Sequence, residues 1–386
     1  MCKLVILLVA ALVIAVTHAH PHSHPPCPSM HVLRDCTCTG PHNGYPNIVC
    51  DGHDMSSSQA FSVMEALPRD VTYSSIELHG FDDMEEVPEH VFDGLHFEHG
   101  SLKIDDSHHH GAAPVLHAHS FEDMDHLEEL TLSYLKLTYV PAIIFPFIKD
   151  SVERLSLKGN DITELIPDAF DELCSTLVEL NLAENNLEFI HPMALRGLHN
   201  LNVLDLSSAA VLYLLPGTFI EVENLETLEL AGNGLVSLQQ GVFAGLHHVE
   251  HLDFTGSSLT WIAPGAFDDT ESILTVDMPN QHLYYIAEDA FRGLTDIEEI
   301  DLSGNHLTTL ASNVFDDDLF DYHHYHHHHH HHHDHDDHVH IDLTDNPLIC
   351  GCDIAWLTVD PFYTEGTCTN GNNFAISLSH LHLACP

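Results

Sequence analysis

Histidine and aspartate are concentrated in one stretch of the chain, from Asp316 to His340, which holds 13 histidines and 7 aspartates. Imidazole and carboxylate groups are common protein ligands of Zn²⁺ and Cu²⁺. The candidate ligands are His323, His324, His326, His327, His328, His329, His330, His331, His332, His333, His335, His338 and His340. The stretch has almost no apolar residue to bury, so we expect a solvated loop that binds zinc or copper. The alternative is a low-complexity tract that expanded without a metal function.

A second set of groups consists of acidic residues that recur with a fixed spacing. Asp205, Glu229, Asp253, Asp277 and Asp301 are separated by 24 residues each, and Asp342 continues the set. These six residues are named the carboxylate ladder. On neighbouring strands, unit charges about 4.8 Å apart repel by roughly 0.9 kcal/mol even in water. A cation or a basic partner surface would relieve this repulsion, whereas side chains that splay apart would need neither.

Motifs for catalysis are absent from the sequence. It contains no Gly-x-Ser-x-Gly, no phosphate-binding loop and no His-Glu-x-x-His. Scattered Asp and His pairs are inevitable at this composition and carry no specific signal. We therefore expect a binding protein rather than an enzyme.

The charge balance is strongly acidic, with 10 lysines and arginines against 59 aspartates and glutamates and a formal net charge of −49. Phosphate backbones and anionic lipid surfaces repel such a chain, which excludes nucleic acid and an anionic membrane as partners. Hydrophobic residues make up 44% of the chain, which is enough to build a folded core.

The first 19 residues have the pattern of a cleaved secretory signal peptide. Lys3 precedes an apolar run from Leu4 to Val16, and Ala19 supplies a small residue for cleavage. The run is too short for a comfortable membrane span, and no second apolar stretch of that length follows. We expect a secreted, extracellular protein.

Eight cysteines form two groups of four near the ends of the chain. The groups are Cys27, Cys36, Cys38 and Cys50, and Cys350, Cys352, Cys368 and Cys385. In an oxidising compartment each group indicates two disulfides, with zinc as the rival interpretation, and spacing alone leaves three pairings per group. Cys174 stands apart, and we expect a buried thiol there, with an intermolecular disulfide as the alternative.

Leucines in the middle of the chain recur as Leu-x-x-Leu-x-Leu with a step of 24 residues, at Leu180, Leu204, Leu228, Leu252, Val276 and Ile300. Each short Leu-x-Leu segment alternates faces as a β-strand does. Counting weaker units near Ile76, Leu102 and Leu130, we expect eleven strands, the last at Ile341. One unit cannot bury its own apolar face, so stacked copies must share a continuous core.

From Val152 to Phe315 this unit resembles the repeat of extracellular leucine-rich repeat proteins. The resemblance implies an α/β-type solenoid with a curved parallel β-sheet on the concave face, irregular or short helical segments on the convex side, and disulfide caps at both ends. The carboxylate ladder would then line the concave face, at a slot where the family often has aspartate. Proteins of this class usually recognise a partner rather than catalyse a reaction.

The two cysteine groups resemble the caps of that family. Their usual connectivity implies the pairs Cys27 with Cys38, Cys36 with Cys50, Cys350 with Cys368, and Cys352 with Cys385. The family's turn asparagine stands at Asn160, Asn185, Asn233, Asn305 and Asn346, but Leu135, Ala209, Ser257 and Gln281 fill the slot elsewhere. We expect looser turns at those four positions.

These features predict five segments. They are a signal peptide (1–19), a His-rich N-terminus with a cysteine-rich cap (20–70), repeats (71–315), a His/Asp-rich insertion (316–340), and a last strand with a cysteine-rich cap (341–386).

The expected function is extracellular recognition, with a protein partner on the acidic concave face and a transition metal on the insertion. One alternative is a non-catalytic accessory subunit of a secreted enzyme, similar in repeat architecture to the leucine-rich chain of a shrimp luciferase. Another is an acidic protein associated with calcium or mineral, which would need oxygen-rich sites rather than histidine.

Overall fold

The computed structural model describes residues 27–40, 44–106, 111–315, 339–358, 362–372 and 374–381. The expected signal peptide, the N-terminal histidines and the insertion up to His338 lie outside these ranges. The chain divides into two compact units. The N-terminal unit comprises Met1–Leu137, Pro141–Ser156 and Phe170–Leu177, and the C-terminal unit comprises Thr138–Val140, Leu157–Ala169 and Val178–Pro386.

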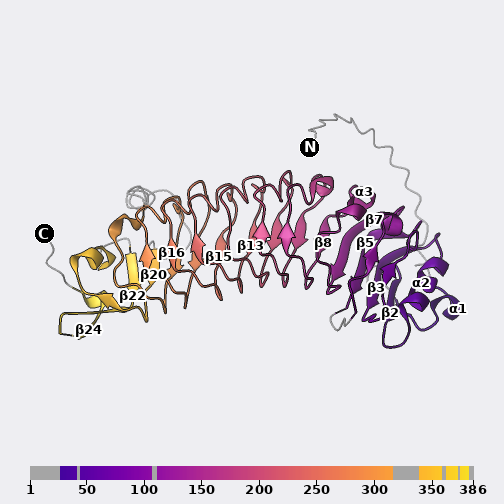
Figure 1. Cartoon of the computed structure of the whole chain (residues 1–386), viewed down its shortest axis with the longest axis horizontal. Helices are drawn as coiled ribbons and strands as arrows, with labels where there is room; N and C mark the ends of the chain where they lie inside the picture. The colour runs from indigo at the N-terminus through magenta and orange to yellow at the C-terminus, as the bar shows by residue number, and fades with distance from the viewer. Residues whose placement is uncertain are drawn as a thin grey trace. The chain divides into compact units, whose positions relative to one another are not determined.

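A mainly parallel sheet forms the N-terminal unit, in the order β1-β2-β3-β5-β7-β8 (Figure 1). The strands are β1 (Thr37–Thr39), β2 (Asn47–Asp51), β3 (Thr72–His79), β5 (His96–Asp105), β7 (Asp125–Ser133) and β8 (Arg154–Ser156). β1 runs antiparallel to β2, and the later strands pair in parallel. Two short strands, β4 (Glu86–Val87) and β6 (Val115–Leu116), also pair in parallel.

Helices of the N-terminal unit are short. They are α1 (Met30–Leu33), α2 (Ser57–Ala66) and α3 (Phe145–Ile148), with 3-10 segments η1 (Ala118–Phe121), η2 (Ala142–Ile144) and η3 (Asp171–Leu173). The start of α2 is fixed by a capping box, because the side chain of Ser56 accepts from the N–H of Gln59 while the Gln59 side chain accepts from the N–H of Ser56.

The C-terminal unit repeats one short strand per 24 residues, and Figure 1 shows these strands in a row. The main strands are β10 (Glu179–Asn181), β12 (Val203–Asp205), β13 (Thr227–Glu229), β15 (His251–Asp253), β17 (Thr275–Asp277), β19 (Glu299–Asp301) and β20 (Val339–Asp342). A second set lies later in each repeat, at β9 (Glu164–Leu165), β11 (Phe189–Ile190), β14 (Ser237–Leu238), β16 (Trp261–Ile262) and β18 (Tyr285–Ile286).

The C-terminal cap combines short strands with 3-10 segments. It contains β21 (Leu348–Ile349), β22 (Phe362–Glu365), β23 (Thr367–Thr369), β24 (Ala375–Ser377), η6 (Cys352–Thr358) and η7 (Leu378–His380), and η4 (Ser312–Val314) precedes the insertion. β22 pairs in parallel with β20. The Nε1–H of Trp356 donates to the carbonyl of Leu310 at 2.8 Å, which ties the cap to the last complete repeat.

The eleven main strands expected from the Leu-x-Leu pattern are all present, and their parallel pairing is confirmed within each unit. Strands β1, β2, β22, β23 and β24 lie in the caps, where no such pattern announces them. One boundary is corrected. The last main strand begins at Val339, so His340 belongs to β20 rather than to the insertion.

Phenylalanines form a stacked core along the repeats of the C-terminal unit. The rings of Phe219, Phe243, Phe267, Phe291 and Phe315 are all buried, and successive centroids lie 6.3, 5.3, 5.9 and 5.1 Å apart. Offset contacts at these separations add to the burial of the rings themselves. Each repeat therefore completes its hydrophobic core only against its neighbours.

The turn asparagines join neighbouring repeats by hydrogen bonds. Asn233 is 2% exposed, and its Oδ1 accepts from the N–H groups of Ala209 and Val211 at 3.1 and 2.9 Å. Its Nδ2 donates to the carbonyls of Leu206 and Leu230 at 2.8 and 2.7 Å. One side chain thus satisfies four backbone groups, three of them in the preceding repeat.

The expectation of looser turns is wrong for Gln281. Its Oε1 accepts from the N–H of Leu259 at 3.1 Å and its Nε2 donates to the carbonyl of Phe254 at 3.1 Å, so the longer amide makes the same connections as asparagine. Ser257 differs, because its hydroxyl is buried and has no hydrogen-bond partner in the described part of the chain.

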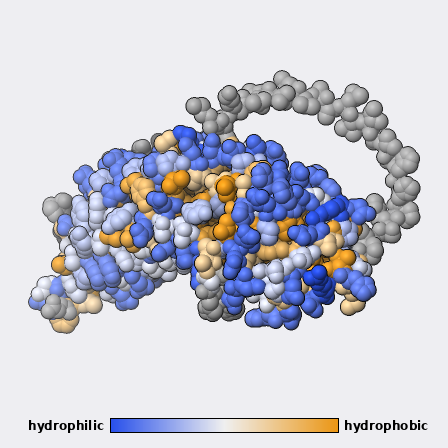
Figure 2. All heavy atoms as spheres, turned by 45° about the vertical axis from the view of Figure 1, so that its right-hand side comes forward, coloured by the Kyte–Doolittle hydropathy of each residue, from blue (hydrophilic) through white to orange (hydrophobic). Residues whose placement is uncertain are grey.

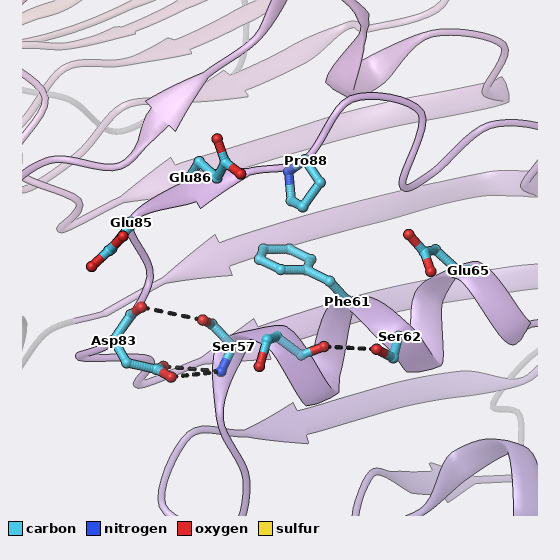
Figure 3. Close-up of a pocket in the computed structure, with 9 residues that line it drawn as sticks. Ser57, Phe61, Ser62, Glu65, Asp83, Glu85, Glu86 and Pro88 are labelled. Atoms are coloured by element: carbon cyan, nitrogen blue, oxygen red, sulfur yellow. Dashed lines mark hydrogen bonds between the residues drawn. The ribbon is translucent and has the colours of Figure 1, made fainter.

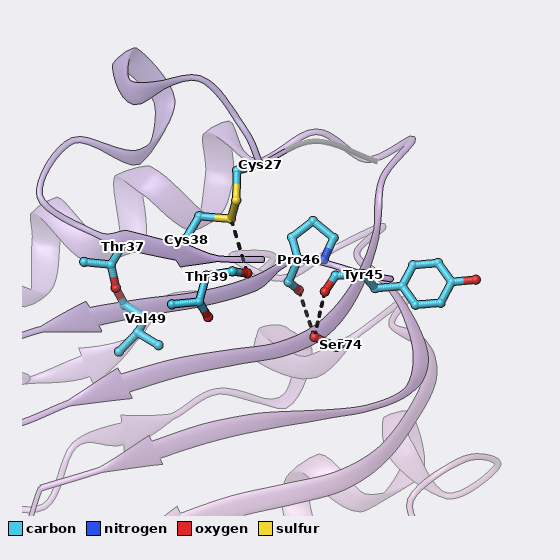
Figure 4. Close-up of a disulfide and its surroundings, with 8 residues drawn as sticks. All are labelled: Cys27, Thr37, Cys38, Thr39, Tyr45, Pro46, Val49 and Ser74. Atoms are coloured by element: carbon cyan, nitrogen blue, oxygen red, sulfur yellow. Dashed lines mark hydrogen bonds between the residues drawn. A yellow bond between two sulfur atoms is a disulfide. The ribbon is translucent and has the colours of Figure 1, made fainter. Parts of the chain in front are cut away.

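Three disulfides hold the caps, and they are the pairs that the family resemblance implies. Cys27 bonds to Cys38, Cys36 to Cys50, and Cys350 to Cys368. Figure 4 shows the first of them at strand β1, where the Ser74 hydroxyl donates to the carbonyls of Tyr45 and Pro46 at 3.1 and 3.2 Å.

Two further cysteines are disulfide-bonded, Cys174 and Cys352. The expected partner of Cys352 is Cys385, which lies outside the described residues. The expectation of a buried thiol at Cys174 is wrong, since this residue is half-buried and oxidised. Among the described residues, no helix has the length and apolar character needed to cross a bilayer.

Replacing Asn233 by Ala tests the role of the turn asparagines. The change leaves two buried N–H groups and two carbonyls without the amide that satisfies them, so we expect the free energy of unfolding to fall by roughly 2–4 kcal/mol. Asn224→Ala is the control, because Asn224 is exposed and donates only to the carbonyl of His199 at 2.7 Å. Urea unfolding followed by circular dichroism measures both, and equal losses would contradict the prediction.

Candidate functional site: the carboxylate ladder

Each residue of the carboxylate ladder ends a main strand of the C-terminal unit. Register pairs Asp205 with Glu229 across β12 and β13, and it pairs Asp253, Asp277, Asp301 and Asp342 successively from β15 to β20. The residue before each of them is a buried apolar side chain, such as Leu252 before Asp253. Because side chains alternate along a strand, the ladder lies on the face turned away from the core, here named the strand face.

The ladder is one carboxylate longer than the sequence pattern indicates. Glu365 on β22 lies opposite Asp342, and Asn181 lies opposite Asp205 at the other end, where its Nδ2 donates to Asp205 Oδ2 at 3.1 Å. Sequence analysis missed Glu365 because β22 lacks the Leu-x-Leu pattern. The only available signal was the alternation of apolar and polar residues in Phe-Tyr-Thr-Glu.

Four ladder aspartates also have a structural role that sequence analysis missed. The Oδ1 atoms of Asp205, Asp253, Asp301 and Asp342 accept from the backbone N–H two residues later, at 2.9, 2.7, 2.8 and 2.8 Å. This Asx-type bond ends the strand and starts the turn. An Asp two residues before a Ser or Thr was the signal for it. Turn formation therefore accounts for one oxygen of each carboxylate.

Asp277 is the exception, because the residue two positions later is Pro279, which has no N–H. Burial raises the pKa of Asp277, and the negative charges of Asp253, Asp301 and Glu299 raise it further. His251 opposes these effects, with its Nε2 at 3.6 Å from Asp277 Oδ2. The middle of the ladder is thus where negative charge is least well compensated.

Two histidines lie on the strand face, each two residues before a ladder residue. His251 contacts the hydroxyl of Thr275 through Nδ1. His340 Nδ1 lies 3.1 Å from Glu299 Oε1, and its Nε2 lies 3.6 Å from Glu365 Oε1. The predicted metal ligand His340 is therefore held between two carboxylates of neighbouring strands.

Cationic side chains do not compensate the ladder. The only lysine and arginines of the C-terminal unit are Lys158, Arg196 and Arg292. Each pairs with an acid outside the ladder: Lys158 with Glu184 at 3.0 Å, Arg196 with Asp168 at 2.6 Å, and Arg292 with Asp268 at 2.6 Å. No Lys or Arg occupies a position of the strand face from β10 to β22.

The strand face of the N-terminal unit is different, because its charges are paired. His79 Nδ1 lies 2.8 Å from Asp105 Oδ1, and its Nε2 lies 3.0 Å from Glu77 Oε2. The hydrogen bond with Asp105, reinforced by Glu77 and opposed by burial, raises the pKa of His79 to about 9. Lys103 lies 3.5 Å from Glu129 across neighbouring strands. Here the protein itself supplies the positive charges.

A pocket of about 390 Å³ lies beside α2 in the N-terminal unit (Figure 3). Its lining is formed by Ser57, Ser58, Phe61, Ser62, Glu65, Asp83, Glu85, Glu86 and Pro88. Both carboxylate oxygens of Asp83 accept from the N–H of Ser57, at 2.9 and 3.2 Å, so this group serves the helix. The pocket offers acceptors and negative charge around an apolar floor.

Hydrophilic side chains cover most of the face seen in Figure 2, with separate hydrophobic clusters between them. Among the exposed large side chains, Phe189, Tyr213 and Tyr285 occupy one slot of their repeats, at 44%, 57% and 55% exposure. This slot lies on the second set of strands and not on the strand face.

The predicted metal ligands from His323 to His338 lie outside the described residues. Within the part of the chain that the structure covers, no three His, Cys, Asp or Glu side chains already surround a point that a metal ion could occupy. Metal binding by the insertion therefore stays a prediction.

The family model described as Leucine rich repeat matches residues 150–211 and 223–283. Together with the stacked parallel strands and the disulfides near both ends, this match shows that the chain is a leucine-rich repeat protein. No curated protein matches it in sequence.

Solved structures share the fold. One chain of the octameric complex of Latrophilin 3 (Lec, Olf), Unc5D (Ig, Ig2, TSP1) and FLRT2 (LRR) has a TM-score of 0.55 at 18% identity, covering 83% of this chain and 92% of that one. Chains of the TLR13–ssRNA13 complex and of the mouse RP105/MD-1 complex each have a TM-score of 0.42, at 15% and 19% identity. Alignment with them covers 84% of this chain and 58% and 65% of theirs.

Replacing Asp277 by Ala should leave the melting temperature at pH 7 unchanged or raise it, while Asp301→Ala should lower it. Asp301 loses its bond to Ser303, worth about 1 kcal/mol, whereas Asp277 makes no such bond. Folding raises the pKa of Asp277, so its ionisation opposes folding above that pKa and has no effect below about 3.9, the unfolded value. The benefit of Asp277→Ala should thus disappear in acid. Melting curves across this range measure both variants, and a loss at pH 7 equal to that of Asp301→Ala would contradict the prediction.

Proposed function

We propose that this protein is a secreted recognition protein whose carboxylate ladder binds a basic surface of an extracellular protein partner. The observation that carries the proposal is the uncompensated row of carboxylates, one per strand, on the strand face of the C-terminal unit. A partner that presents lysines or arginines with a similar spacing would relieve the repulsion within the row.

Three observations support a specific surface rather than general acidity. The cations of the C-terminal unit are held in ion pairs elsewhere, the central Asp277 has a raised pKa, and the corresponding face of the N-terminal unit is neutralised by its own side chains. Leucine-rich repeat proteins are typically interaction scaffolds, and the structural neighbour described above was solved in a complex of several proteins. Disulfides near both ends suit an oxidising extracellular space.

The second part of the proposal is that the His/Asp-rich insertion binds zinc or copper. Its support is the chemistry of the sequence, since neutral imidazole and carboxylate are ligands for both ions. A carrier role for a secreted enzyme would use the same binding face, so native co-purification with an enzymatic activity distinguishes that alternative.

Neutralising the ladder tests the partner site. Asp253→Asn with Asp301→Asn removes two ladder charges, and Glu223→Gln with Glu271→Gln removes two from exposed side chains off the strand face. With a lysine-rich peptide as the probe, we expect the ladder variant to lose about tenfold more affinity at low salt than the control variant. Calorimetric titration at low and at physiological salt measures both. Equal losses would mean that only net charge matters, and would overturn the ladder as a site.

Deleting residues 316–338 tests the metal site. Because this stretch lies between Phe315 and Val339, outside the repeat's apolar phase, we expect the shortened protein to fold with an unchanged melting temperature. It should lose most of its capacity for Zn²⁺ and Cu²⁺. Metal analysis after dialysis measures this capacity, and Ca²⁺ titration separates the calcium alternative. Full capacity in the deleted protein would exclude the insertion as the main site.

A further inference from the structure

Two successive turns of the N-terminal unit carry the same His-x-x-acid spacing. One contains His90 and Asp93, and the next contains His119 and Glu122. Between each pair stands a fully buried phenylalanine, Phe92 in the first turn and Phe121 in the second, with ring centroids 5.8 Å apart. The polar pairs are therefore presented side by side above one hydrophobic anchor.

Backbone hydrogen bonds hold the two turns together on both sides of these pairs. The N–H of His90 donates to the carbonyl of His119 at 3.0 Å, and the N–H of Gly94 donates to that of Asp123 at 2.9 Å. The two imidazoles stack with centroids 5.6 Å apart and 21° between their planes. Phe147 contacts the His119 ring edge to face at 5.0 Å, which restricts its rotation.

Four donor atoms converge between the turns. His90 Nδ1 lies 2.8 Å from Asp93 Oδ2, His119 Nδ1 lies 2.8 Å from Glu122 Oε2, and His90 Nδ1 lies 3.7 Å from the same Glu122 oxygen. The side chains are between 32% and 56% exposed, so water and ions can reach them. Glu122 therefore links both histidines.

Asp93 carries a second sign that this cluster is incomplete. Its Oδ1 is buried and has no hydrogen-bond partner within the described residues. A buried carboxylate oxygen without a partner is costly and calls for an explanation. The nearest cation is Arg69, whose Nη1 and Nη2 donate to the carbonyls of Met64 and Val91.

We infer that His90, Asp93, His119 and Glu122 form a binding site for one divalent transition-metal ion, with zinc the best match. Ligands about 2.1 Å from a tetrahedral zinc are about 3.4 Å from one another, and the donor atoms here are already separated by 2.8 to 3.7 Å. In the described conformation they bond to each other through protons. Zinc would replace those protons after the side chains open by about half an ångström.

Charge also favours the ion. Two carboxylates and two neutral imidazoles carry a charge of −2, which one divalent cation cancels. Two histidines with two carboxylates suit zinc better than calcium or magnesium, which prefer oxygen ligands. Because the site joins two repeats, bound metal would add a cross-link between the turns. The inference does not depend on the insertion or on the carboxylate ladder.

Hydrogen exchange with mass spectrometry on the full-length protein tests the site, because it reports each segment separately from the insertion. With free zinc at about ten times the dissociation constant, we expect amides in 89–95 and 117–124 to exchange roughly tenfold more slowly. His119→Gln should abolish this protection. His119 is 44% exposed, so the substitution opens no core cavity, and the zinc-free exchange pattern verifies its fold.

His96→Gln is the matched control. His96 Nδ1 pairs with Asp125 Oδ2 at 2.9 Å on the strands of the same two repeats, and the pair has no second histidine. This variant should keep the full zinc protection at 89–95 and 117–124. No slowing in the wild-type protein, or equal slowing in His119→Gln, would overturn the inference. Either result leaves metal binding by the insertion to be decided by its own deletion variant.

Discussion

The structure depends on a buried amide that joins each turn to the repeat before it. A parallel strand of three residues cannot satisfy its own backbone groups or cover its own apolar side. Asn233 satisfies four such groups at once, and the stacked phenylalanines bury the interior of the same repeats. Gln281 shows that the constraint is the connection and not the residue, since a longer amide reaches the same kind of backbone partners. The regular spacing of all other side chains follows from this stacking.

That regular spacing gives single acidic residues a collective effect. Locally, Asp253 or Asp301 ends a strand by accepting a backbone N–H, which is sufficient reason for an aspartate at this slot. Stacking then places these charges in a row that no lysine or arginine interrupts. Where the local role is missing, at Asp277 before Pro279, the charge is the least compensated. The same residues thus serve the turns and create the negative face.

The N-terminal unit uses the neighbour relation between repeats in another way. Its strand face pairs His79 with carboxylates on its own strand and on the next, and Lys103 with Glu129 across strands. Its turns bring His90 and Asp93 against His119 and Glu122. Both clusters arise because residues 26 to 29 positions apart in sequence become direct neighbours in space. One face becomes neutral, and the turns gain a set of converging metal-ligand atoms.

The sequence by itself determined the repeat, the eleven main strands, the fold class and the positions of the ladder residues, because the period of the leucines is set by local alternation and by the length of one turn. Three disulfides match the pairs that the family resemblance implies. Only the tertiary structure decided that Glu365 extends the ladder, that His340 lies in a strand, and that Gln281 replaces asparagine. It alone also brought His90 to His119. These features depend on which side chains face each other across neighbouring repeats, and that relation is fixed by register and backbone hydrogen bonds between strands and turns rather than by any pattern within one repeat.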